Sequence, residues 1–292
     1  MPPKPVSPLE ARFHGGTAPA SACPLARKRS PDHISSIDVR GSAIGGGRFV
    51  VVAGPCAIES YEQFRGLADT VVAQGLQFMR GGAFKPRTSP YSFDGLHREG
   101  LEILRRVKDE TGVRCVTELM SIPDLDAVAE VADIVQIGSR HMQNFPLLHA
   151  VGGLAKPVLL KRGFGNTLEE LLLAAEHILS RGNSSVILCE RGIRTFDHSQ
   201  RNTLDLMAVP ILKSETHLPV IVDPSHSVGR PRFIPAAVQG ALALGADGVM
   251  VEVHPDPDAA LSDGPQSLSL AEFGAMMEAL RKMASALGRE LS

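Results

Sequence analysis

Residues 48–75 read RFVVVAGPCAIESYEQFRGLADTVVAQG and combine two periodicities. The first seven residues form an apolar, β-branched run that is typical of a buried strand. Residues 60–75 then place apolar side chains at helical spacing and end on a glycine. The stretch therefore predicts a strand followed by a helix, the repeating unit of a parallel α/β fold.

The same pair of patterns recurs along the chain. Further strands are predicted at 76–82, 113–119, 133–140, 156–163, 184–192, 218–226 and 247–255. Each precedes a predicted helix, and these helices cover 95–112, 121–132, 144–155, 167–182, 202–217, 232–246 and 269–288. Eight such units in about 240 residues predict a (β/α)8 TIM barrel. A doubly wound sheet would have fewer strands and a GxGxxG turn after the first one, which is absent there.

Residues 1–46 differ from the rest in composition. They are rich in Pro, Ala, Ser, Arg and Gly, and neither periodicity holds for long. The segment also lacks the apolar region of a secretory signal. We expect a flexible or loosely docked N-terminal extension over 1–46 and a single catalytic barrel over 47–292.

The composition limits the classes of protein to consider. Of 292 residues, 43% are hydrophobic and 21% are charged, as in ordinary globular enzymes, and the formal net charge is -2. This charge argues against a nucleic-acid partner, and no apolar run approaches the ~20 residues of a membrane span. The four cysteines are widely spaced and form no CxxC pair, which favours free thiols and a cytoplasmic location.

Each predicted strand ends in or just before an ionisable side chain. In a barrel these ends meet at one mouth, where active sites of the fold lie. A mouth with four or five Arg and Lys side chains would repel itself unless anions bind there, so we expect small polyanionic substrates. In chain order the residues are Cys56, Arg80, Glu118, Arg140, Lys161 with Arg162, Glu190 with Arg191, Asp223 with His226, and Glu252 with His254.

Four of the side chains near these ends are of metal-ligand type. Cys56, His226 and Glu252 follow three different strands, and Asp263 lies in the loop after the last one. A thiolate, an imidazole and carboxylates suit Mn, Fe, Co or Zn better than Mg, which prefers oxygen ligands only. His254 is either a competing ligand or a residue that supports one, and the sequence leaves this open.

Several longer motifs resemble those of a known family. They are GPCAIES (54–60), RGGAFKPRTSPYSF (80–93), QIGSRHMQNF (136–145), LLKRG (159–163), ILCERGIRTF (187–196), VDPSHS (222–227) and VEVHPDPDAALSDGPQSL (251–268). In this order they resemble 3-deoxy-D-arabino-heptulosonate 7-phosphate (DAHP) synthase of the type I-beta subclass. The resemblance implies a (β/α)8 transferase that condenses phosphoenolpyruvate with erythrose 4-phosphate, in the first step of the shikimate pathway of aromatic amino acid biosynthesis. It also implies a divalent metal on Cys56, His226, Glu252 and Asp263.

The resemblance assigns roles to the remaining residues. Phosphoenolpyruvate would be held at its carboxylate by Arg80 and Lys85 and at its phosphate by Arg140, Lys161 and Arg191. The loop KPRTS would bind the aldose phosphate through Arg87 and Thr88, with Ser89 beside them. The implied catalytic residues are Lys161 as proton donor, Glu118 to orient a water, and Asp223. For Glu118, an ion pair with Lys85 or Arg80 is an equal alternative.

Three other functions stay open at this point. The first is 3-deoxy-D-manno-octulosonate 8-phosphate synthase, which shares the phosphoenolpyruvate half but uses arabinose 5-phosphate. The second is an aldolase that forms a Schiff base on Lys161. The third is a catalytically silent regulatory subunit, for which loss of Cys56 or His226 would be the signature. In every case we expect a homo-oligomer, a dimer or a tetramer.

Overall fold

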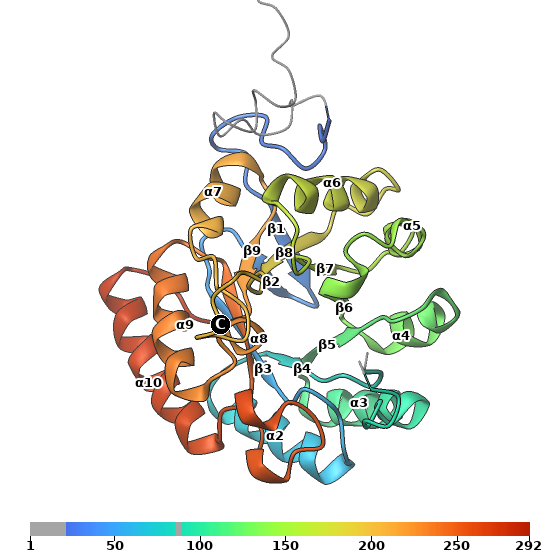
Figure 1. Cartoon of the computed structure of the whole chain (residues 1–292), viewed down its shortest axis with the longest axis vertical. Helices are drawn as coiled ribbons and strands as arrows, with labels where there is room; N and C mark the ends of the chain where they lie inside the picture. The colour runs from blue at the N-terminus through green and yellow to red at the C-terminus, as the bar shows by residue number, and fades with distance from the viewer. Residues whose placement is uncertain (1–21, 86–88) are drawn as a thin grey trace, which may run out of the picture.

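The computed structural model describes residues 22–85 and 89–292, and it confirms the (β/α)8 barrel. Eight parallel strands close on themselves in the order β10-β3-β4-β5-β6-β7-β8-β9 (Figure 1). They are β3 (Val50–Gly54), β4 (Phe78–Arg80), β5 (Arg114–Glu118), β6 (Ile134–Ile137), β7 (Val158–Lys161), β8 (Val186–Glu190), β9 (Val220–Val222) and β10 (Gly248–Glu252). All eight overlap the predicted strands.

Helices alternate with the strands and surround the barrel (Figure 1). They are α2 (Tyr61–Ala73), α3 (His97–Thr111), α4 (Leu125–Val131), α5 (Phe145–Gly152), α6 (Leu168–Leu179), α7 (Ala208–Glu215), α8 (Pro224–Val228), α9 (Ile234–Ala243) and α10 (Leu270–Ala286). Short 3-10 turns are η1 (Ile122–Asp124), η2 (Ser139–His141), η3 (Pro231–Phe233), η4 (Pro257–Ala259) and η5 (Gly264–Gln266). The helix predicted over 202–217 is shorter than expected, because it begins at Ala208.

The strands are apolar because both of their faces are buried. Side chains such as Val51 and Val249 point outward and pack under the helices in the larger hydrophobic cluster. Alternate side chains such as Val52 and Met250 fill the interior of the barrel in a second cluster. The interior is therefore a packed core, and the chemistry is confined to the ends of the strands.

An antiparallel hairpin closes the end of the barrel where the strands start. It consists of β1 (Ser36–Val39) and β2 (Ser42–Gly45), and its Ile37, Val39 and Ile44 belong to the interior cluster. Arg114, the first residue of β5, donates from Nε to the carbonyl of Val39 at 2.8 Å. Burying each of these aliphatic side chains contributes roughly 1.5–3 kcal/mol.

The packing of residues 22–46 differs from the expected flexible or loosely docked extension. The amide of Leu25 donates to Glu176 of α6, and that of Lys28 to the carbonyl of Glu215 in α7. Figure 1 places this segment, in blue, beside α6 and α7. The alternation of Ile37 and Val39 supplies apolar surface that composition alone did not reveal. Residues 1–21 lie outside the described residues.

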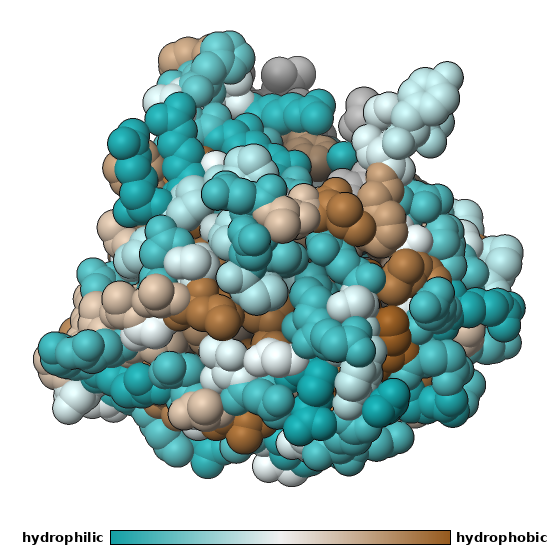
Figure 2. All heavy atoms as spheres, turned by 90° about the horizontal axis from the view of Figure 1, so that it is seen from below, coloured by the Kyte–Doolittle hydropathy of each residue, from teal (hydrophilic) through white to brown (hydrophobic). Residues whose placement is uncertain are grey.

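The outer surface of the barrel is mixed in character. Figure 2 shows one face, where hydrophobic areas are separated by hydrophilic side chains. Exposed apolar residues such as Val72, Met207 and Phe233 occur on different elements. Within 22–85 and 89–292, no helix combines the length and the hydropathy that crossing a membrane requires.

Candidate active site

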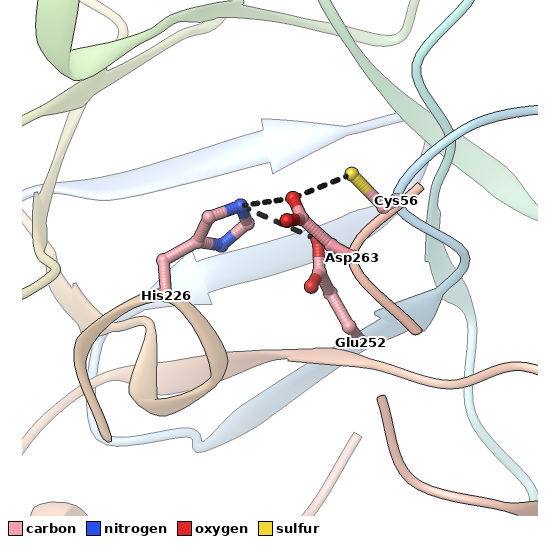
Figure 3. A group of neighbouring side chains, drawn as sticks. All are labelled: Cys56, His226, Glu252 and Asp263. Atoms are coloured by element: carbon pink, nitrogen blue, oxygen red, sulfur yellow. Dashed lines mark hydrogen bonds and ion pairs between the residues drawn. The ribbon is translucent and has the colours of Figure 1, made fainter. Parts of the chain in front are cut away.

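The four predicted metal ligands lie together at the carboxyl ends of neighbouring strands (Figure 3). Cys56 follows β3, Glu252 ends β10, His226 lies in α8 directly after β9, and Asp263 lies in the loop after β10. Because β9, β10 and β3 are adjacent in the barrel, their ends bring these side chains to one place. One ligand atom from each residue lies within 4.8 Å of the others.

Close contacts join the four side chains. Cys56 Sγ lies 3.1 Å from Asp263 Oδ2, and His226 Nε2 lies 3.3 Å from Glu252 Oε1 and 3.9 Å from Asp263 Oδ2. Glu252 Oε1 is buried and accepts no hydrogen bond from the described residues, although the guanidinium of Arg80 approaches it to 3.2 Å. Glu252 Oε1 is therefore free to accept a further ligand beside His226 Nε2.

His226 is oriented by Asp223. The Asp223 carboxylate accepts from the backbone amide of His226 at 3.0 Å and contacts its Nδ1 at 2.8 Å. This leaves Nε2 facing the other ligands, as is usual for a metal-binding histidine. Burial holds the pKa of His226 below its ordinary value, which favours the neutral ring that a metal requires.

Asp223 also forms an ion pair with Lys161. Burial by itself would raise the pKa of Asp223, but His226 and Lys161 outweigh it and hold this pKa well below its usual range. Because Asp223 touches both side chains, it links the predicted proton donor to a predicted metal ligand. Sequence analysis grouped Asp223 with the catalytic residues without giving it this role.

The surroundings of Cys56 and Asp263 shift the pKa of both ligands. Burial, followed by the charge of Glu252, raises the pKa of the Cys56 thiol to about 12. The thiol donates toward Asp263, and the hydroxyl of Ser262 lies 3.1 Å from the sulfur. For Asp263, burial opposes ionisation, but His226 and Arg201 lower its pKa.

This donor set fits a divalent transition metal. It offers one sulfur, one imidazole nitrogen and two carboxylates, with the imidazole already held in the required tautomer. A bound cation would explain why the buried Glu252 Oε1 accepts no hydrogen bond from the described residues. Such a mixed soft and hard set is less suited to Mg, which prefers oxygen ligands only.

A cavity of about 320 Å³ opens beside these ligands. Its charged lining consists of six cations and two carboxylates, counted among the described residues: Arg80, Lys85, Arg140, Lys161, Arg191, Arg201, Glu118 and Asp263. Adding Asp223 and Glu252, which touch Lys161 and Arg80, brings the carboxylates to four. Cations are still in excess, so the cavity attracts anions.

Arg80 is a buried cation of this cavity with unsatisfied donors. It is buried, and neither Nε nor Nη1 has a hydrogen-bond partner in the part of the chain that the structure describes. Lys85 instead donates to the carbonyl of Cys56 at 3.0 Å. A buried guanidinium with free donors on the wall of a cavity favours a carboxylate or phosphate ligand.

Phe164 lines the cavity, and three arginines lie near its ring. The guanidinium carbons of Arg140, Arg191 and Arg194 lie 5.6, 4.8 and 4.6 Å from the centre of its ring. Each distance is within the range of a cation–π contact. Sequence analysis missed Phe164, Arg194 and also Arg201, which pairs with Asp263 at 3.2 Å. Their only signal was a position in loops that follow barrel strands.

Glu118 lines the cavity but forms no ion pair with Lys85 or Arg80 within 4.0 Å. Its Oε2 accepts from the side-chain amide of Gln136 at 3.0 Å, a residue that sequence analysis did not single out. Its Oε1 packs on Gly138, where an added Cβ would lie only 2.0 Å away. The ion-pair alternative for Glu118 therefore finds no support in these contacts.

Not every predicted residue faces the cavity. Arg162 Nη1 forms ion pairs with Glu190 at 2.8 Å and with Asp205 at 3.0 Å, so this side chain has a structural role. Ser89 lines the cavity, whereas Arg87 and Thr88 lie outside the described residues. The four cysteines are free thiols, as expected.

A closed (β/α)8 barrel with a cation-lined cavity beside a cluster of metal-ligand type is the architecture of a barrel enzyme. The chain belongs to the DAHP synthetase I family, whose model matches residues 31–289, and it is an enzyme of that family. The family predicted from the motifs is thereby confirmed.

Two kinds of relative are similar to the chain. A phospho-2-dehydro-3-deoxyheptonate aldolase of Thermotoga maritima is 53% identical over 252 residues, which cover 86% of this chain and 75% of the relative. A 2-dehydro-3-deoxyphosphooctonate aldolase of Syntrophobacter fumaroxidans is 32% identical over 265 residues, covering 85% and 91%.

Solved structures agree with the observed fold. A crystal structure of DAHP synthase from Thermotoga maritima superposes with a TM-score of 0.89 at 48% identity, covering 92% of this chain and 78% of that one. A truncated form of the synthase from the same organism gives 0.87 at 46% identity, covering 93% of this chain and all of that one.

Proposed function

We propose that this enzyme is a metal-dependent DAHP synthase, which condenses phosphoenolpyruvate with erythrose 4-phosphate to give DAHP and inorganic phosphate. The observation that carries the proposal is the excess of cations in one cavity that shares Asp263 and His226 with the four-ligand cluster. Two anionic substrates need such a cavity, and an aldehyde needs an electrophilic activator beside it.

Phosphoenolpyruvate would lie between Arg80 and Lys85 at its carboxylate and Arg140, Lys161 and Arg191 at its phosphate. The free donors of Arg80 support the first assignment. The approach of Arg140 and Arg191 to the same Phe164 ring supports the second, because the ring brings two guanidinium groups to one part of the cavity. Arg87, Thr88 and Ser89 remain the proposed contacts of the aldose phosphate.

The reaction forms a bond from C3 of phosphoenolpyruvate to the aldehyde carbon, adds water to C2, and breaks the C2–O bond to phosphate. A divalent metal, when bound by Cys56, His226, Glu252 and Asp263, supplies Lewis-acid activation of the aldehyde. Lys161 would donate the proton that the former aldehyde oxygen takes up, and Asp223 orients its ammonium. Glu118, held by Gln136, would orient the water.

A second candidate is the synthase that uses arabinose 5-phosphate. The 32% identity to a 2-dehydro-3-deoxyphosphooctonate aldolase favours it, whereas the 53% identity to a deoxyheptonate aldolase and the KPRTS loop favour erythrose 4-phosphate. The two differ in the aldose that the cavity accepts.

A competition assay distinguishes the two candidates. The enzyme is given phosphoenolpyruvate with equimolar erythrose 4-phosphate and arabinose 5-phosphate, and the products are separated by mass. We expect almost only the seven-carbon product. A predominance of the eight-carbon product would overturn the proposal in favour of the second candidate.

The structure gives less support to the two further alternatives, a Schiff-base aldolase and a catalytically silent subunit. A Schiff base would need the Lys161 amine free, but Asp223 holds it in a buried ion pair. A silent subunit would not need four gathered ligands. Assembly into a dimer or tetramer remains a prediction, which sedimentation equilibrium checks.

A further inference from the structure

Asp263 is held differently from the other three ligands of the cluster. It lies in the loop between β10 and η5, and most of residues 255–261 are exposed. Its backbone has φ 54, a left-handed conformation that is uncommon for residues with a side chain. The loop therefore needs contacts from elsewhere if Asp263 is to keep its place beside Cys56.

Glu59 supplies one of these contacts. Its Oε1 accepts a hydrogen bond at 2.9 Å from the backbone amide of Leu261, two residues before Asp263. Glu59 itself lies three residues after Cys56, in the segment between β3 and α2. One hydrogen bond thus joins the segment that carries the sulfur ligand to the loop that carries the last carboxylate.

The other oxygen of Glu59 faces His254. Glu59 Oε2 lies 3.5 Å from His254 Nε2, and the side chains are only 12% and 6% exposed. His254 Nδ1 accepts from the backbone amide of Asp256 at 3.1 Å, so Nε2, the nitrogen on the side of Glu59, carries a ring hydrogen. Nε2 has no hydrogen-bond partner among the described residues.

His254 is in turn bonded to the segment that follows η5. Its backbone amide donates to the carbonyl of Leu268 at 2.9 Å, and it lies two residues after the ligand Glu252. Glu59 lies on the segment that carries Cys56. Its carboxylate contacts the segment that carries Asp263, through Leu261, and the segment that carries Glu252, through His254. His254 faces Glu59 and not the ligands, which answers the question that the sequence left open.

We propose that Glu59, supported by His254, is a positioning residue that sets the place of Asp263 in the metal site. The inference rests on the proposed metal-dependent function. Loss of Glu59 would free the amide of Leu261 and let the exposed loop move, so that metal affinity falls although all four ligands are present. Residues that orient metal ligands typically contribute about 10- to 100-fold to metal affinity.

The test is a double-mutant cycle read by Co²⁺ binding to the metal-free protein. Affinity is measured from the absorption of the thiolate–cobalt bond in the wild type, Glu59→Ala, Asp263→Ala and the double variant. Glu62→Ala is the matched control, because Glu62 is an exposed residue at the start of α2. Melting of the metal-free proteins checks that each is folded. If Glu59→Ala is not, Glu59→Leu takes its place, because leucine fills part of the same space but offers no acceptor to the amide of Leu261.

We expect Glu59→Ala to bind Co²⁺ about 10- to 100-fold more weakly and Glu62→Ala to bind normally. Because Glu59 acts through Asp263, the double variant should bind no more weakly than Asp263→Ala alone. Equal binding by the wild type and Glu59→Ala, or fully additive losses in the double variant, would overturn the inference. Failure of the wild type to bind Co²⁺ would instead contradict the proposed function.

Discussion

At the scale of single residues, Asp223 is the centre of the site. It is fully buried, and its carboxylate contacts both Lys161 and His226. A buried carboxylate between two nitrogen groups fixes the positions of both, so the proton donor and the metal ligand share one support. Their separation is therefore set by the ends of β7 and β9 rather than by mobile loops.

Replacing Lys161 tests the proton donor. Lys161→Met keeps a side chain of similar length but removes the ammonium group, so Asp223 loses one ion-pair partner. We expect kcat to fall by about 100-fold or more and the KM for phosphoenolpyruvate to rise. Steady-state kinetics with Lys282→Met, an exposed lysine of α10, serve as the control. Near-normal turnover in Lys161→Met would remove Lys161 from the mechanism.

A single added methyl group tests Glu118. In Gly138→Ala the Cβ would meet Glu118 Oε1 at 2.0 Å, and the flexible carboxylate would swing aside at little cost to stability. We predict that kcat falls by about 10- to 100-fold while the melting temperature hardly changes.

Gly165→Ala is the control for this change, because a Cβ there meets no atom within 4 Å. If both variants turn over at the wild-type rate, Glu118 does not orient the water.

Much of the site was predictable at this scale. Cys56, His226, Glu252 and Asp263 were found because barrel topology brings strand ends together, whatever their spacing in sequence. Phe164 and Arg201 were not found, because their approach to Arg191 and Asp263 depends on the paths of loops. Arg162 was grouped with the residues of the mouth, although it pairs with Glu190. Periodicity cannot distinguish a cation that faces the cavity from one that forms an internal ion pair.

At the scale of elements, the hairpin β1–β2 shows what sequence patterns missed. Eight strand and helix pairs followed from periodicity, because each strand is buried on both faces and each helix on one. The hairpin has only four residues in each strand, and it lies in a segment whose composition suggested an extension. Its alternating Ile37 and Val39 were the available signal.

The hairpin should stabilise the barrel at the end where the strands start. Ile44 is 1% exposed, so Ile44→Ala leaves a cavity among the interior side chains and should lower the free energy of unfolding by about 2–5 kcal/mol. Ile34→Ala, at a residue that is 53% exposed, should change it by less than about 0.5 kcal/mol. Urea unfolding compares the two. Equal midpoints would mean that the hairpin does not contribute to the core.

At the scale of the whole molecule, the two ends of the barrel have different roles: one stabilises the sheet and the other forms the site. At the starts of the strands, buried Asp133 and Asp247 accept from the amides of Cys115 and Val220 at 2.8 Å, which holds neighbouring strands together. At the other end the cations exceed the carboxylates, although the chain as a whole has a formal net charge of -2. This separation lets a nearly neutral protein present a site for anions.

The most direct test of the account is the release of phosphate from phosphoenolpyruvate with erythrose 4-phosphate, measured before and after a chelator and again after Mn²⁺ or Co²⁺ is restored. The account predicts release that the chelator abolishes and the metal restores, with none of it in Cys56→Ala. Release that continues unchanged in the chelator, or no release under any of these conditions, would contradict a metal-dependent condensation at this site.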